Sequence, residues 1–427
     1  MKQIIEIYHR RSSLWLILEL ILVTVACWWA FDPVIVDTYT KHLPLGFDTD
    51  RVIKIDVGNT SNYKDDWDMH YEINNETDIL CKKIQEMEEV EIAEVGDEYD
   101  QIGFSDGLYD VFYNDKDSFS VRHLSFSRDS KIFLINGIES LTPNVPTSEL
   151  TSECEPKECV IITRSMAMAF YGTIDLAGRT IKGRLYRWNN DKKKTEYMIT
   201  PLRIHAVVED VRPDMNDGNF CTAFICGWGS YYKPIIVRLR DGVNPERFIE
   251  QYKREMQHNL ITKHCYIRNM QSSSQYIKED YENGWHGRRT RRNLLIAAFF
   301  AFNLTFGVIG TLLMYTNQRK EEAGVKMAFG ATRLSIFFGF LRESWLITTL
   351  SVLIGCIIYF QIAYTSNLNI APAYMQGNHY WFDSFWSHFL VVSLCVYLII
   401  FSFVLLGTAI PAWRISRTNI TDALREE

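Results

Sequence analysis

The side chains of this chain that could bind a metal ion or react as nucleophiles are cysteines and histidines between residues 37 and 292. His258, His264 and Cys265 lie close together, and these residue types are common zinc ligands. Their spacing matches no usual ligand pattern, so surface and strand positions explain them better than a metal site does. Six of the nine cysteines lie in this region: Cys81, Cys154, Cys159, Cys221, Cys226 and Cys265.

Two pairs of these cysteines are close enough in sequence to close short disulfide loops. They are Cys154 with Cys159, and Cys221 with Cys226. An even number of cysteines in an oxidising compartment permits disulfides, but the connectivity cannot be deduced from sequence, and free buried thiols are an open alternative. Neither pair has partner histidines at zinc-finger spacing, which disfavours zinc.

The sequence lacks the common motifs of enzyme active sites. It has no G-x4-GK[ST] phosphate-binding loop, no H-E-x-x-H zinc motif and no G-x-S-x-G nucleophile motif. Acidic runs such as Glu86–Glu98 are typical of solvated faces. We therefore predict a non-catalytic chain that binds no metal, cofactor or nucleic acid of its own.

Four apolar runs dominate the 427 residues, and each has the roughly 20 residues that a membrane-spanning helix needs. The first is longer than the core of a signal peptide and is followed by no A-x-A cleavage site, so we interpret it as an uncleaved anchor. A lipoprotein processing box at Thr24–Cys27 is a poorer fit. The four runs are Leu14–Val36, Leu294–Tyr315, Ser344–Ala363 and Phe389–Ile410.

The distribution of basic residues predicts the orientation in the membrane. The loop between the second and third runs holds Arg319, Lys320, Lys326 and Arg333, whereas the loop over residues 364–388 has no Lys or Arg. Because short cytoplasmic loops are enriched in basic residues, we expect the first loop and both termini in the cytoplasm and the region between the first two runs outside.

One basic run, Arg288–Arg292, conflicts with this orientation because it adjoins the second apolar run on the external side. We interpret it as a helix start whose long side chains reach the interface. A contact with phosphate or a lipid headgroup is the alternative.

The external region, residues 37–292, has the mixed pattern of an α+β domain. Apolar residues alternate from Arg51 as in a strand, and from Thr77 they recur as on a helix. A strand, a turn and a helix follow from Lys233, with Asn244 and Pro245 suited to the helix start. Similar strand–helix units flank a long segment at about residues 90–230, so the domain has one or two subdomains.

Glu19, Arg342 and Glu343 are ionisable residues that lie within or beside the apolar runs. Glu19 is inside the first run, where a carboxylate is costly. It either makes an interhelical contact that changes with conformation or lies near the cytoplasmic interface. Arg342 and Glu343 adjoin the third run, and we interpret them as interfacial.

The segment 317–331, NQRKEEAGVKMAFGA, is a short charged helix between two apolar runs. Residues 331–341 continue it as a basic and then apolar stretch suited to the membrane interface. Gly324 and Gly330 allow close approach of a partner surface. Such an element could transmit force from a cytoplasmic protein, or it could be an ordinary positively charged loop.

The stretch Glu322–Ala331 resembles the E-I-G-I-R-K-A-L-G-A motif of the FtsX/MacB family of ABC-transporter permeases, the mechanotransmission type. Ala323 and Met327 depart from this motif. The ending from Pro411, PAWRISRTNITDALREE, resembles the end of the same family, with Ile420 where a proline is usual. In the external domain, the stretch from Val160 resembles part of a MacB-like periplasmic domain.

This resemblance implies an α-helical membrane protein with four transmembrane helices plus a large α+β extracytoplasmic domain between helices 1 and 2, in a bacterial inner membrane. It implies a homodimer, or a heterodimer with a similar permease, that works with a separate cytoplasmic ABC ATPase. That partner binds ATP and Mg, and this chain binds neither. A periplasmic adaptor, an outer-membrane channel and membrane lipids are further implied partners.

Two functions fit the resemblance. The first is export or efflux of antimicrobial compounds, peptides or lipoproteins. The alternative is an FtsX-like regulator that switches a periplasmic partner such as a cell-wall hydrolase. The departures at Ala323, Met327 and Ile420 leave the identity of the ATPase open.

The resemblance assigns ATPase coupling to two groups of residues. The first is in the charged segment: Arg319, Glu322, Gly324, Lys326, Gly330 and Ala331. The second is in the C-terminal tail: Pro411, Arg414, Arg417, Leu424 and Arg425. The predicted organisation is a cytoplasmic N-terminus (1–13), a first transmembrane helix (14–36), the periplasmic domain (37–292), a second helix (293–316), a coupling segment (317–343), a third helix (344–363), a periplasmic loop (364–388), a fourth helix (389–410) and a cytoplasmic tail (411–427).

Overall fold

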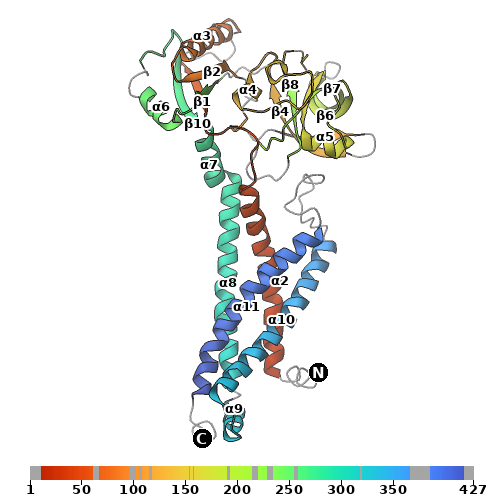
Figure 1. Cartoon of the computed structure of the whole chain (residues 1–427), viewed down its shortest axis with the longest axis vertical. Coiled ribbons are helices and arrows are strands. Elements are labelled where there is room, and N and C mark those ends of the chain that lie inside the picture. Colours follow the sequence, from red (N-terminus) through yellow and green to blue (C-terminus); the bar gives the residue numbers. More distant parts are fainter. Residues whose placement is uncertain are drawn as a thin grey trace. The chain divides into compact units, whose positions relative to one another are not determined.

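The computed structural model forms two compact units (Figure 1). One contains the long helices near both ends of the chain, and the other spans Thr40–Gly287. The described residues are 11–60, 67–96, 102–104, 108–114, 118–152, 154–156, 158–189, 193–213, 220–227, 234–253, 258–317, 320–365 and 385–417.

Long helices form over all four apolar runs. Three satisfy the length and hydropathy of a membrane span within the described residues, and they confirm the first, third and fourth predicted runs: Leu14–Lys41, Arg333–Ile362 and Trp386–Ser416. The second run lies in a continuous helix that is not among these three, so a fourth span stays a prediction. The helices of this unit are α2 (Arg11–Lys41), α8 (Trp285–Asn317), α9 (Lys320–Ala328), α10 (Arg333–Thr365) and α11 (Phe385–Ser416).

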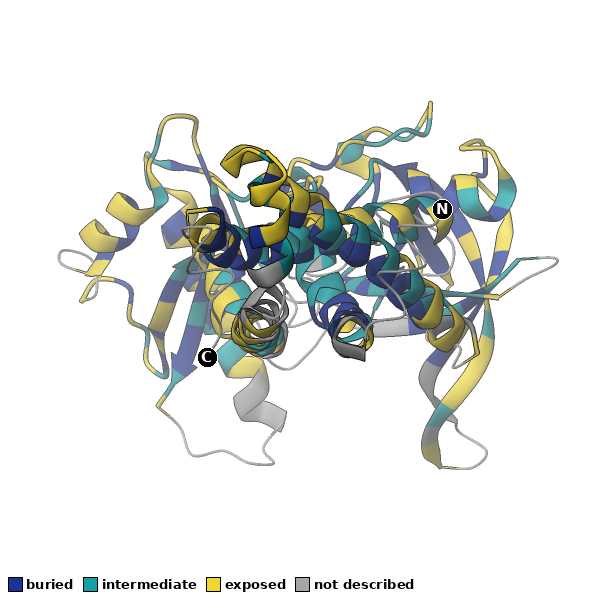
Figure 2. Cartoon of the chain, turned by 90° about the horizontal axis from the view of Figure 1, so that it is seen from below, coloured by how far each residue is buried: buried dark blue, intermediate teal, exposed yellow. Residues whose placement is uncertain are grey.

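Helices α2, α10 and α11 share one apolar core. A Cβ on Gly355 of α10 would lie 2.6 Å from the Cβ of Thr24, so α2 and α10 approach closely at this glycine. The helices seen end-on in Figure 2 present buried residues on one face and exposed residues on another. The core includes Leu16, Leu20 and Trp28 of α2, Ile347, Val352 and Tyr359 of α10, and Val392, Val396 and Ile400 of α11.

The first sheet of the α+β unit has the order β10-β1-β9-β2, and its neighbouring strands are antiparallel. Helices α3 (Trp67–Gln85) and α6 (Pro245–Gln251) contribute apolar residues to its core. The predicted strand from Arg51 and the strand–turn–helix from Lys233 are confirmed, and the Asn244 side chain accepts a hydrogen bond from the Arg247 N–H at 3.0 Å. The strands are β1 (Val52–Asn59), β2 (Val90–Val95), β9 (Ile235–Leu239) and β10 (Cys265–Ser272).

The second sheet closes into a barrel with the order β3-β4-β8-β5-β7-β6. Two of its strand pairs, β4 with β8 and β5 with β7, are parallel. β5 and β8 are buried along their whole length because alternate residues face two different apolar cores. The strands are β3 (Leu108–Tyr113), β4 (Ser118–Phe126), β5 (Cys159–Thr163), β6 (Thr180–Asn189), β7 (Lys194–Val208) and β8 (Thr222–Cys226).

Short helices complete this unit. α5 (Arg164–Tyr171) adds Met166, Ala167 and Phe170 to the core that all six barrel strands share. α4 (Ile132–Ile135) belongs to the second barrel core. α7 (Ser273–Asn283) follows β10 and ends just before α8 begins.

Candidate coupling site

Helix α9 joins α10 through a tightly defined turn. The N–H of Gly330 donates to the Met327 carbonyl and the N–H of Ala331 donates to the Lys326 carbonyl, both at 3.0 Å. Gly330 has a φ of +91°, and this pattern is the Schellman ending that favours glycine. Thr332 then caps α10, since its hydroxyl accepts from the Ser335 N–H at 3.2 Å. α9 is therefore joined to α10 by a well-defined turn with no long linker.

One side of α9 packs against the bundle. Ala323, only 2% exposed, shares an apolar cluster with Ile336 and Phe340 of α10. Ala412 and Ile415 of α11 complete the cluster. α9 is thus held by two long helices, because a small residue at position 323 lets its backbone approach them closely.

The other side of α9 is exposed and combines charge with apolar surface. The Lys326 ammonium donates to the Glu322 carboxylate at 2.9 Å, one helical turn apart. Phe329 is 89% exposed, and Leu334 and Val325 are exposed as well. A large aromatic side chain with this exposure is typical of an interaction surface, where such residues supply much of the binding energy.

A hollow of about 270 Å³ lies between α9 and α10. Its polar lining comes from Glu322, Lys326, Ser335 and Glu343, and its apolar wall from Ala323, Ala331, Ile336 and Phe340. Glu343, expected to be interfacial, therefore belongs to the same local surface as the motif.

The structure brings most of the described motif residues together. Glu322, Gly324, Lys326, Gly330 and Ala331 lie in or directly after α9, and Gly324 is buried. Arg342 is exposed on α10. Arg319, Leu424 and Arg425 lie outside the described residues.

The first part of the predicted C-terminal tail continues helix α11. Pro411 is buried within this helix, and Arg414 is exposed in its last turn. The Arg417 guanidinium lies 4.1 Å from the centre of the Trp413 ring, a cation–π contact. Residues 411–416 therefore form the end of a long helix that reaches α9.

Glu19 lies against Gly307 of α8. A Cβ on Gly307 would collide with the Glu19 carboxylate, so this glycine allows the two helices to meet. This geometry favours the interhelical interpretation of Glu19 over the interfacial one.

A second polar contact inside the bundle escaped the sequence patterns. Asp32 Oδ1 of α2 and His388 Nε2 of α11 lie 2.9 Å apart, at ion-pair distance but without the alignment of a hydrogen bond. Trp28 meets His388 edge-on at 5.8 Å and donates to Ser393 at 3.1 Å, and Tyr359 stacks on Trp28. The sequence signals for this contact were Asp32, which is followed by a proline within an apolar run, and His388, which we assigned to the 364–388 loop.

The candidate ligands His258, His264 and Cys265 do not form a metal site among the described residues. His264 contacts the Glu76 carboxylate at 2.9 Å, and Cys265 is buried in the core of the first sheet. Burial raises the pKa of the Glu76 carboxyl, but hydrogen bonds from the Thr262 hydroxyl and from His264 and Cys265 lower it to about 2. Glu76 therefore ties α3 to the start of β10.

Comparison with solved structures gives matches to single domains of transport proteins. The periplasmic region of MacB from Actinobacillus actinomycetemcomitans matches with a TM-score of 0.30 and 11% identity, covering 56% of this chain and 95% of that one. A domain of a putative permease protein from Porphyromonas gingivalis matches at 0.29 and 18%, covering 52% and 92%. The extracellular domain of the transporter YknZ from Gram-positive bacteria matches at 0.28 and 10%, covering 51% and 100%. These scores are too low to decide the fold or the function of this domain.

Comparison of sequences gives two further matches. A protein of Pseudomonas fluorescens named "Probable export ATP-binding/permease protein" is 30% identical over 142 residues, which cover 32% of this chain. The chain spans only 20% of that protein's length. Residues 294–420 match the family described as FtsX-like permease C-terminal, and this range contains α9, α10, α11 and most of α8. The chain thus has an FtsX-like permease C-terminal domain over residues 294–420.

Proposed function

We propose that this chain is the membrane subunit of an ABC-type export system and that a separate cytoplasmic ATPase binds the exposed side of α9. The observation that supports this most directly is the two-sided character of α9, since its inner side is fixed to α10 and α11, while Val325, Lys326 and, directly after the helix, Phe329 are exposed. A push on that surface would move both long helices together.

The proposed topology has four spans, with α8 as the second, and both termini in the cytoplasm. The α+β unit then lies outside the cytoplasm, in the periplasm of a bacterial inner membrane. The basic residues of the α9 region, including Lys326 and Arg333, support this orientation.

Export is the preferred role because the name of the Pseudomonas fluorescens relative includes both export and ATP binding. The match is confined to one fifth of that protein, so the cargo, the ATPase and the oligomeric state of this chain are part of the proposal. The chain itself supplies no catalytic residue in this scheme, and the partner binds ATP and Mg.

The two departures from the family motif in α9 lie on the side that packs against the bundle. Ala323 is buried against α10 and α11, and Met327 packs against the same cluster. These two changes therefore alter packing inside the bundle. Glu322, Gly324 and Gly330 match the motif; among them, Glu322 supplies surface charge and Gly330 forms the turn.

The test is affinity purification of the full-length chain from membranes, with the amount of co-purified ABC ATPase and its ATP hydrolysis as readouts. F329D places a charge where we expect a buried contact. The affinity for the ATPase should therefore fall by about 30-fold, which is the effect of a strong interface residue. K326E should reduce it as well, because it breaks the pair with Glu322.

The matched control is I174D, which introduces the same charge at an exposed apolar residue of the α+β unit. It should leave the ATPase bound. If F329D retains the ATPase as well as I174D does, the outer side of α9 is not the binding surface.

A further inference from the structure

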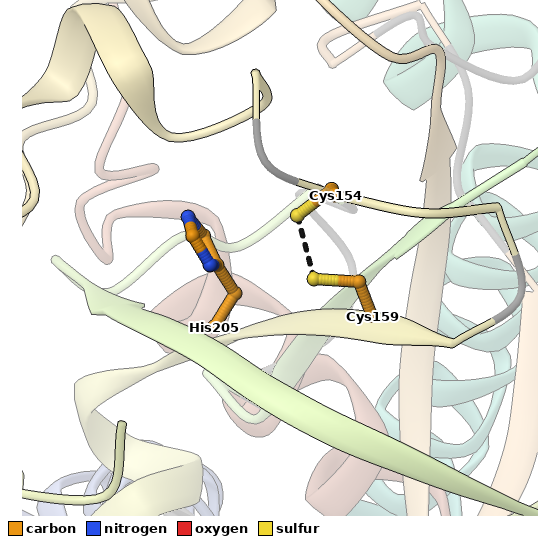
Figure 3. A group of neighbouring side chains, drawn as sticks. All are labelled: Cys154, Cys159 and His205. Atoms are coloured by element: carbon orange, nitrogen blue, oxygen red, sulfur yellow. Dashed lines mark hydrogen bonds between the residues drawn. The ribbon is translucent and has the colours of Figure 1, made fainter. Parts of the chain in front are cut away.

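Two thiols and an imidazole meet in the second core of the barrel (Figure 3). Cys159 begins β5, Cys154 lies in the turn before it, and both are almost completely buried. Their Sγ atoms face one another 2.6 Å apart. His205 of β7 lies beside them, with its ligand atom within 4.8 Å of both sulfur atoms.

The local fold fixes this arrangement. β5 and β7 pair in parallel, with Val160 opposite Ile204 and Ile161 opposite Ala206, so His205 is the extra residue of a bulge. Leu202 and Ile204 face the other core, so the alternation of the strand places His205 on the side of the cysteines, and the bulge adds Ala206 to that side. The Arg203 N–H donates to the Glu158 carbonyl at 2.8 Å, which holds the turn between the two thiols against β7.

We propose that Cys154 and Cys159 form an intrachain disulfide in the mature protein. The proposal rests on the proposed placement of the α+β unit outside the cytoplasm, where disulfides persist. The bond would close the turn that leads into β5 and fix it to the second barrel core.

The other cysteine pair with the same spacing cannot do this. Cys221 directly precedes the extended strand β8 and Cys226 ends it, and the two residues face different cores. Five residues of strand separate their backbones by about 16 Å, far more than the roughly 7 Å that a disulfide can span. The structure therefore distinguishes two pairs that the sequence left equivalent.

A metal ion is a less suitable occupant. Two thiolates on one tetrahedral zinc, each about 2.3 Å from the metal, would hold their sulfur atoms about 3.8 Å apart. The two sulfur atoms here are much closer than that. The same side chains thus suit a sulfur–sulfur bond better than shared coordination.

The oxidation needs an external electron acceptor, which we assign to a protein disulfide of an extracytoplasmic thiol oxidant. A thiolate of the pair attacks one sulfur of that disulfide, giving a mixed disulfide and releasing one oxidant thiolate. The second thiol loses its proton and attacks the mixed disulfide, which forms the Cys154–Cys159 bond and releases the second thiolate. Two S–H bonds are replaced by one S–S bond, and two electrons and two protons leave the chain. The hydrogen bond between the two thiols lowers the pKa of Cys159, which favours Cys159 as the thiolate.

The test uses the full-length chain purified from bacterial membranes without reductant, denatured in the presence of a thiol-alkylating maleimide. Trypsin cleaves after Lys157, between the two cysteines, and gives the peptides 132–157 and 158–164. We expect mass spectrometry to find these two peptides joined and to find them separated after reduction. Cys221, which belongs to the other barrel core, should be alkylated without reduction and is the internal control.

A parallel measurement separates this inference from the proposed placement. I174C puts a thiol at an exposed site of the same unit, and a membrane-impermeant maleimide should label it from outside the inner membrane. If I174C is labelled from outside while Cys154 and Cys159 are both alkylated, the disulfide is wrong and the placement stands. If I174C is protected from the outside, the placement is wrong. If the purified protein holds stoichiometric zinc and the two thiols are alkylated only after chelation, the site binds a metal and the disulfide is wrong.

Stability gives a second readout. Closing a loop of six residues should raise the melting temperature of the unit by about 4–9 °C. Reductant should therefore lower the melting temperature of the wild type and of C221S/C226S, and should have no effect on C154S/C159S. An equal response to reductant in all three proteins would overturn the proposal.

Discussion

The contact between Asp32 and His388 tests how α2 is held to α11. Asp32 Oδ1 and His388 Nε2 lie 2.9 Å apart, His388 is fully buried, and the Asp32 side chain is 15% exposed. A polar contact at this separation inside the bundle is favourable, and the desolvation of both groups offsets much of the gain. We expect a net coupling of about 1–3 kcal/mol between the two side chains.

The assay is a double-mutant cycle on the purified chain in lipid nanodiscs, with the free energy of unfolding measured for D32L, H388F and the double variant. Each single change should destabilise by about 3 kcal/mol, because it leaves a buried polar group without the opposite member of the contact. The double change should cost about 3–5 kcal/mol, less than the sum of the two single costs, because apolar side chains then replace both members. The control cycle combines D32L with S402A, an exposed position of α11, and should be additive. Additive costs for D32L and H388F would show that the two side chains do not stabilise one another.

Two further predictions concern a turn and a carboxylate. G330A should lower the free energy of unfolding by about 1 kcal/mol. No atom lies within 4 Å of the added Cβ, so the whole cost comes from the positive φ. The control is G339A, in an equally open position inside α10, which should be neutral or stabilising in the same unfolding assay. Glu76 has a pKa lowered to about 2, so its stabilisation is fully present above about pH 4.5 and is lost as the pH falls through 2. E76Q should therefore remove up to about 3 kcal/mol of the free energy of unfolding at pH 7 and flatten the decline in stability below pH 4.5. E72Q, at a more exposed carboxylate near His264, should do neither. A decline that is equally steep in E76Q and in the wild type would refute the role of Glu76.

Local patterns predicted the elements whose formation depends on neighbouring residues. The alternation from Arg51, the Asn244 cap and three of the apolar runs correspond to elements in the structure. The charged segment after residue 317 also forms a short helix. In each case the information lies within a few turns or one strand, which is the range of capping and periodicity.

Contacts between distant segments were beyond the sequence. The parallel pairing of β5 with β7 and the bulge at His205 depend on closure of the barrel. The contact of Asp32 with His388 depends on the packing of α2 against α11. Ala323 showed as a departure from a motif, but only the packing of α9 shows that this residue faces the bundle. Such features need partner segments that no local pattern specifies.

A continuous series of contacts leads from the exposed side of α9 to the chain segment that enters the α+β unit. α9 is fixed to α11 by Ala323, Ala412 and Ile415, and α11 contacts α2 through His388 and Asp32. α2 continues to Lys41, and β1 begins soon afterwards at Val52. Each step is a packed or ion-pair contact between regular helices, and such elements deform little. Motion imposed on α9 would therefore reach α2 without any rearrangement of loops. In this scheme, D32L/H388F should retain the ATPase on α9 but weaken the effect of ATP on the α+β unit.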